Sequence, residues 1–232
     1  MEIILNTNLL TDEHKQHIKP QLEKLITDLS ASLNITSLKK VIIPANFTEE
    51  IIEFQKACNK EKIGHRDTEG GTTFAKVISY DELNDFSQVI FLHESFIAAL
   101  VTGEKADDVV HYIQHELGHV HDSFYTKDIF TPSPINSIES NRLQALLFEH
   151  SEVIWSEYFA NRSSFSTASS KIMLSTFQNV KDNVEVVTVK SKEYIDRYRN
   201  NGDTFELINN LSQSTDLLFY YSDKPGWSAD DA

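Results

Sequence analysis

The spacing of apolar residues predicts a first half of mixed helices and strands. Thr11, Asp12 and Glu13 have the composition of a helix start, and apolar residues then recur at helical intervals up to residue 33. Pro20 falls inside this pattern, so we expect it to kink the helix or to delay its start. Residues 41–43 (VII) form a short apolar run that a proline ends, which predicts a buried strand.

A second helix and two further strands are predicted before residue 100. Residues 48–50 (TEE) have the composition of a helix start, and apolar positions follow them partly on one face. Residues 73–80 and 88–93 are rich in β-branched and aromatic side chains, which is typical of strands. The first half therefore combines both kinds of element.

From about residue 104 onward, the pattern predicts helices almost throughout. Asp107 or Asp108 is expected to cap a helix over residues 107–124, whose apolar positions lie one helical turn apart. A second, long helix should span about residues 138–165, because no glycine or proline interrupts this stretch. These two helices carry most of the chemistry described below.

Residues 184–189 (VEVVTV) have the composition of a strand, but their context predicts a helix. Positions on one stripe recur at alternating steps of four and three, and we give this periodicity more weight than the poor helix propensity of valine. Gly202 should end this helix, and Asp203 with Glu206 resembles a capping box that begins a last one. The positions of the stripe are Met173, Phe177, Val180, Val184, Val187, Ser191, Tyr194 and Tyr198.

Composition and charge narrow the classes of partner. The 232 residues carry a formal net charge of −14, which repels phosphate backbones and anionic lipid surfaces, so we expect neither a nucleic-acid nor a membrane partner. The N-terminus has no basic segment of a signal peptide, and we expect a cytoplasmic protein. Cys58 is the only cysteine, which excludes an intrachain disulfide, and we expect a buried thiol.

The segment His115-Glu116-Leu117-Gly118-His119 has the spacing of a zinc site on a helix. His115 and His119 lie one turn apart on the same face, so both imidazoles can bind one cation. Glu116 lies about 100° further round the helix, where it can reach a water bound to the metal. Zinc lowers the pKa of that water, and the glutamate takes its proton as the hydroxide attacks a carbonyl. We therefore expect Glu116 to be the general base.

A catalytic zinc needs a third protein ligand and an open coordination position. The long helix predicted downstream offers several carboxylates, and the spacing alone does not choose between Glu149, Glu152 and Glu157. Three side chains are candidates for stabilising an oxyanion, although packing or contact with solvent is the simpler interpretation of each. They are Tyr125, His150 and Tyr158.

The sequence Glu157-Tyr158-Phe159-Ala160-Asn161 resembles the glutamate motif of the gluzincin branch of the zincin metallopeptidases. The resemblance implies that Glu157 is the third ligand and that Asn161 orients a ligand histidine. Together with the His-Glu-x-x-His segment, this motif is similar to that of ImmA/IrrE-type peptidases. The similarity covers the two motif segments.

The resemblance also implies a zincin-like α+β fold. A small twisted mixed sheet in the N-terminal half would carry the His-Glu-x-x-His helix, and a mostly helical C-terminal half would follow. An edge strand, supplied by residues 73–80 or 88–93, would bind an extended peptide above the metal. We expect a zincin-like domain over residues 1–167 and a helical extension packed on it over residues 168–232.

The function expected from the sequence is that of a zinc metallopeptidase, an endopeptidase with one Zn²⁺ per chain and a peptide or protein substrate. Two alternatives are open. The chain can be a metal-binding regulatory or interaction protein that keeps the zincin fold without turnover, although such a protein has no need of Glu116. The motif can also be accidental, with both histidines on an ordinary helix face.

Overall fold

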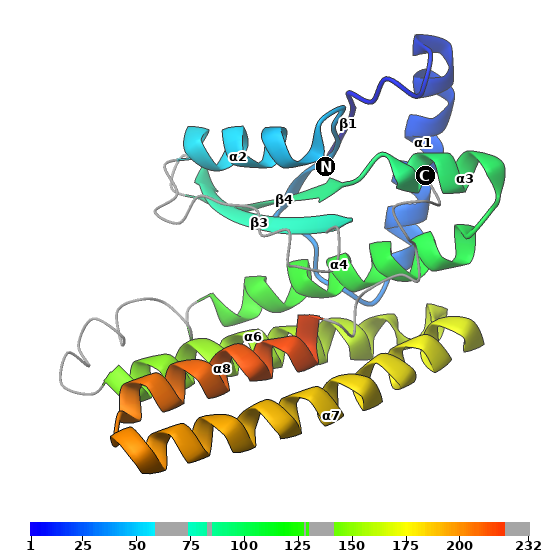
Figure 1. The fold of residues 1–232 in the computed structure, drawn as a ribbon. Coiled ribbons are helices and arrows are strands. Elements are labelled where there is room, and N and C mark those ends of the chain that lie inside the picture. The colour runs from blue at the N-terminus through cyan, green and yellow to red at the C-terminus, as the bar shows by residue number, and fades with distance from the viewer. Residues whose placement is uncertain (59–73, 83–84, 128, 130–141, 221–232) are drawn as a thin grey trace. The chain divides into compact units, whose positions relative to one another are not determined.

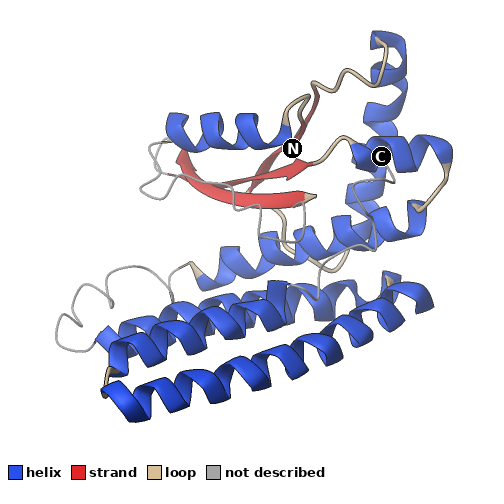
Figure 2. Ribbon diagram, viewed as in Figure 1, coloured by secondary structure: helices blue, strands red, loops and turns tan. Residues whose placement is uncertain are grey.

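A computed structural model of the protein describes residues 1–58, 74–82, 85–127, 129 and 142–220 (Figures 1 and 2). The chain divides into two compact units, and each is described by itself. The first unit comprises residues 1–129 and 158–167, and the second comprises residues 130–157 and 168–231. The division into residues 1–167 and 168–232 that the sequence suggests stays a prediction.

The first unit contains a four-stranded mixed sheet with the strand order β1-β2-β4-β3. The strands β1 (Glu2–Leu5), β2 (Leu38–Ile43) and β4 (Asp85–Leu92) are parallel, and β3 (Ala75–Glu82) pairs antiparallel with β4. An α+β fold with a small mixed sheet in the N-terminal half is therefore confirmed, as are the three predicted strands. The first strand, β1, was not predicted.

The position of β4 corrects one expectation about the edge of the sheet. Residues 88–93 cannot supply an edge, because β4 pairs with β2 on one side and with β3 on the other. The other candidate, residues 73–80, has its residues 75–80 on the edge strand β3, which among the described strands pairs with β4 alone. Strand order depends on long-range pairing, which a local pattern of side chains does not contain.

Helices cover both faces of this sheet (Figure 1). On one face, α2 (Phe47–Ala57) packs through Phe47 and Ile51 onto Ile78, Val89 and Phe91. Because side chains alternate along a strand, the neighbours of these residues point to the opposite face, where α4 (Ala106–Thr126) packs. The fully or nearly fully buried residues on that side include Ile3, Val41, Ile43, Ile90 and Leu92. The central strands are therefore buried on both faces.

Two further helices complete the N-terminal part of this unit. The first, α1 (Asp12–Leu29), is capped by Thr11, whose side chain accepts a hydrogen bond from the amide of His14. It contains Pro20, so the alternative of a delayed helix start is wrong. The short helix α3 (Ser95–Thr102) ends at Gly103, which has a positive φ of 76°.

The helix α4 begins differently from the expectation. Its N-cap is Lys105, which has a left-handed backbone (φ 58°) and makes no side-chain capping bond. Asp107 and Asp108 lie in the first turn instead, where carboxylates interact favourably with the helix dipole. The prediction that one of these aspartates is the cap is therefore wrong, although the helix itself is confirmed.

The remaining helices form the C-terminal half, as predicted. The long helix α6 (Arg142–Ser164) crosses the division between the two units and continues into a short 3-10 turn, η1 (Phe165–Thr167). In the second unit, α7 (Ser170–Asn201) and α8 (Thr204–Tyr220) form an antiparallel pair joined at Gly202 (Figure 1). The valine-rich residues 184–189 lie inside α7, so their prediction as helix is confirmed.

Among the described residues, no helix combines the length and the hydropathy that crossing a membrane requires.

Candidate metal centre

The helix α4 is buried on two opposite faces, and this arrangement positions the two histidines. One face carries Ile113 and Leu117, which are almost fully buried under the sheet. At about 100° per residue, His111 and His115 lie roughly opposite this apolar face. They are nevertheless buried too, at 7% and 3% exposure, because the end of α6 covers that side of α4 within the first unit.

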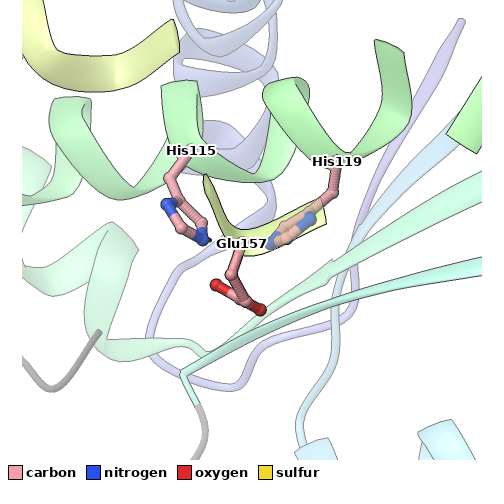
Figure 3. Close-up of side chains that lie close together, drawn as sticks. All are labelled: His115, His119 and Glu157. Carbon is pink, nitrogen blue, oxygen red and sulfur yellow. Dashed lines mark hydrogen bonds between the residues drawn. The ribbon is translucent and has the colours of Figure 1, made fainter. Parts of the chain in front are cut away.

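His115, His119 and Glu157 converge at one point (Figure 3). Both imidazoles extend from α4 toward the carboxylate of α6, and the Nε2 atoms of the two histidines are 3.0 Å apart. One ligand atom from each residue lies within 4.8 Å of the other two. His115 is buried, the other two residues are half-buried, and the Oε2 atom of Glu157 is out of contact with solvent.

This group could hold a metal ion. In a tetrahedral zinc site with Zn–N distances of about 2.05 Å, two ligand nitrogens are about 3.3 Å apart, close to the separation found here. The carboxylate of Glu157 supplies a negative charge beside the two imidazoles, which favours a cation at this point. Two imidazoles and one carboxylate are also a donor set that divalent transition metals accept.

Gly118 lets the two ligand-bearing helices approach each other closely. It sits one residue before His119, and a Cβ atom added to it would lie 2.8 Å from the Cα atom of Ala160 on α6. The same Cβ would also collide with the hydroxyl of Ser163. Only glycine therefore fits at this crossing, which belongs to the first unit and lies less than one turn from Glu157.

A second contact ties the end of α6 to α4 further back. The Nδ1–H group of His111 donates to the carbonyl oxygen of Ser164 at 3.1 Å, and Thr167 donates to the side-chain oxygen of Gln114 at 2.8 Å. Burial lowers the pKa of His111 below its ordinary value, and the neighbouring His115 acts in the same direction. His111 is therefore a neutral, structural partner of α6 near neutral pH.

A third contact lies on the other side of the glycine crossing. The ring of His121 stacks on the ring of Phe159, with an interplanar angle of 1° and a centroid distance of 5.1 Å. The Nδ1 atom of His121 accepts a hydrogen bond of 2.7 Å from the backbone amide of Asn34. Burial lowers the pKa of His121, and Asp122 partly opposes this shift. His121 is one of four histidines on α4, and nothing in the sequence points to Phe159 as its partner.

The candidates for oxyanion stabilisation, and Asn161, were also predicted from the sequence. The hydroxyl of Tyr125 is exposed and accepts a hydrogen bond from the side-chain amide of Asn34, whereas that of Tyr158 accepts one from Arg162. The side chain of His150 lies outside the described part of the structure. The carbonyl oxygen of half-buried Asn161 accepts from Ser164, and its role toward a ligand histidine stays a prediction.

The three carboxylates that the sequence offers as a third ligand differ in their position relative to the two histidines. Glu157 is the one that meets the two histidines, whereas Glu152 is exposed and the side chain of Glu149 lies outside the described residues. Glu116 is half-buried on α4.

No protein-family model, curated protein or solved structure matches this chain.

Proposed function

We propose that the protein is a zinc-dependent metallopeptidase of the zincin type, with His115, His119 and Glu157 as the metal ligands. The observation that carries the proposal is that ligand atoms of these three side chains, which come from two different helices, lie within 4.8 Å of one another. We assign zinc to this group because two histidines and one glutamate are the protein ligands of well-known catalytic zinc sites.

When bound, zinc supplies a Lewis acid that acidifies water and polarises a carbonyl group. The chain supplies the rest of the chemistry. Glu116 lies between the two ligand histidines in the sequence and is half-buried, so its carboxylate can accept the proton that the attacking water loses. The same carboxyl group can then donate this proton to the leaving amine, which completes the hydrolysis of a peptide bond.

An extended peptide is the substrate that the fold supports. The strand β3 is an edge of the sheet and also contacts α4, the helix that carries Glu116. Backbone N–H and C=O groups on an edge strand can pair with a peptide in the extended conformation. A substrate bound in this way would lie along the sheet on the side of the catalytic helix.

The substitution Glu116→Gln tests this function. It keeps the shape of the side chain but removes the base, so we expect the variant to bind zinc as tightly as the wild type and to cut a mixed peptide library at least about 100-fold more slowly. The matched control is Glu152→Gln, which neutralises an exposed acid on α6 and should leave cleavage unchanged.

Two results would contradict the proposal. Unchanged cleavage by the Glu116→Gln variant would remove the assigned base. Stoichiometric zinc binding by a wild-type chain that cuts no peptide would instead favour the regulatory alternative, in which the metal is structural.

A further inference from the structure

The three contacts described above join α4 to the last turns of α6 within the first unit. They differ in how strongly each can fix the rotation of α6 relative to α4. The bond from His111 to Ser164 lies at the far end of α6, about two turns beyond Glu157. The crossing at Gly118 lets the helices approach closely but offers only small side chains, Ala160 and Ser163. The stack of His121 on Phe159 is the contact that involves two large rings.

Each ring of this stack lies two residues after a proposed metal ligand. His121 follows His119 by two residues on α4, and Phe159 follows Glu157 by two residues on α6. A helix turns by about 100° per residue, so a small roll of α6 about its own axis would swing the carboxylate of Glu157 away from the imidazoles. Two planar rings in parallel contact resist such a roll more than a glycine–alanine crossing does, because their contact area is larger.

The ring of His121 is itself held in place. Its Nδ1 atom accepts the 2.7 Å hydrogen bond from the amide of Asn34, which precedes β2, so the hydrogen of the neutral ring sits on Nε2. The ring of Tyr125 lies against the same imidazole, with a centroid distance of 4.8 Å. The imidazole therefore presents a fixed plane to Phe159 rather than a rotating one.

We infer that His121 and Phe159 are positioning residues that hold Glu157 at the metal, a role that rests on the proposed function. They set the rotation of α6 relative to α4, and Gly118 sets the distance between the two helices. Neither ring touches the metal, so their effect on the site passes through the backbone of α6.

Zinc affinity of the full chain tests this inference. We expect Phe159→Leu, which removes the ring but keeps an apolar side chain, to weaken zinc binding about 10- to 100-fold, the usual range for residues that orient a metal ligand. Phe159→Tyr keeps the stacked ring and should bind zinc within about twofold of the wild type. Competition against a chelator measures both affinities, and the visible absorption of the Co²⁺-substituted protein reports the ligand geometry.

A matched control separates positioning from general stability. Phe54 lies on α2, on the face of the sheet opposite α4, and it packs edge-to-face against Phe91, with a centroid distance of 5.5 Å. Phe54→Leu should therefore lower the melting temperature of the metal-free protein much as Phe159→Leu does, but it should leave zinc affinity and the Co²⁺ spectrum unchanged. The double variant His121→Leu/Phe159→Leu should lose no more affinity than either single variant, because the two rings act as one unit.

The outcomes are distinguishable. Equal zinc affinity in Phe159→Leu and the wild type, or an equal loss in Phe54→Leu, would overturn the positioning role while leaving the zinc site intact. A wild-type chain that binds no zinc would overturn the proposed function and this inference with it.

Discussion

The helices α4 and α7 are both amphipathic, yet they differ in how deeply they are buried. The 21 residues of α4 include nine buried ones, spread over two faces. The 32 residues of α7 include one, Ile172, and its apolar side chains Leu174 and Phe177 are 70% and 71% exposed. A periodic apolar pattern thus occurs in a helix buried on two faces and in one that is mostly exposed.

This difference bears on the candidate metal site. Packing on two faces holds the side chains of α4 in place before any metal binds, which favours a preorganised set of ligands. The sheet fixes one face of α4, and the end of α6 fixes the other, where His115 lies. Within its own unit, α7 packs against α8. Three substitutions in these helices test this contrast, and a pH effect at His93 tests burial elsewhere in the first unit.

The largest effect is expected at Leu117, on the face of α4 under the sheet. This side chain is fully buried, so Leu117→Ala should lower the free energy of unfolding by about 3 kcal/mol, from lost burial and the cavity that remains. Urea denaturation of the metal-free protein measures the change. A loss below about 1 kcal/mol would contradict the tight packing of this face.

A somewhat smaller loss is expected at Gly118, on the opposite face. The methyl group of Gly118→Ala would lie 2.8 Å from the Cα atom of Ala160, so the two helices must separate. We expect a loss of about 2 kcal/mol in stability, typical of an overpacked contact, and weaker zinc binding because Glu157 moves with α6. If zinc affinity is unchanged while stability falls, then the crossing does not set the position of the ligand.

A pH effect is expected in the first unit, through His93 at the end of β4. Burial lowers the pKa of His93 below its ordinary value, and the nearby Glu94 only partly opposes this. The unfolded chain therefore takes up the proton more readily than the folded one. The contribution of neutral His93 to stability is complete above about pH 6.5, the unfolded pKa, and it is lost as the pH drops from there toward the lower folded pKa.

The variant His93→Asn isolates this contribution. Asparagine keeps an acceptor for the amide of Ser95, which now donates to the Nδ1 atom of His93 at 3.2 Å, but it does not titrate. The free energy of unfolding of the metal-free variant should thus decline less steeply on acidification than that of the wild type. Identical slopes would show that this histidine is not protected from protonation.

The smallest effect is expected at Phe177 on α7. Its side chain is 71% exposed, so Phe177→Ala should change the free energy of unfolding by no more than about 0.5 kcal/mol. Thermal and urea denaturation of the full chain check this value. A loss like that of Leu117→Ala would mean that the two helices are packed alike, and the contrast between them would fail.

Local patterns in the sequence predicted the elements better than their arrangement. The steps of four and three were sufficient to predict α7 as a helix in spite of its valines, because periodicity reports which residues share a face. The four-residue strand β1 was missed because no proline or glycine ends its apolar run, whereas a proline ends the run at residues 41–43. The order of the strands was missed because it depends on pairing between distant segments.

In the candidate site, too, the features within one helix were predictable from the sequence, and those that depend on the packing of two helices were not. The spacing of His115 and His119 is a local property of one helix, so their convergence could be predicted. The choice among Glu149, Glu152 and Glu157 depended on a resemblance, because which acid faces α4 is decided by the crossing at Gly118. The partnership of His121 with Phe159 joins two helices and has no counterpart in either segment alone.

Zinc stoichiometry and affinity test the central claim most directly. We expect one zinc per wild-type chain and a stabilisation of about 4 kcal/mol at a free zinc concentration about a thousand times the Kd. His119→Gln and Glu157→Gln should lose most of this binding, whereas Glu152→Gln, on an exposed position of the same helix, should keep it. A wild-type chain without stoichiometric zinc, or equal binding in Glu157→Gln and Glu152→Gln, would contradict a site built from His115, His119 and Glu157.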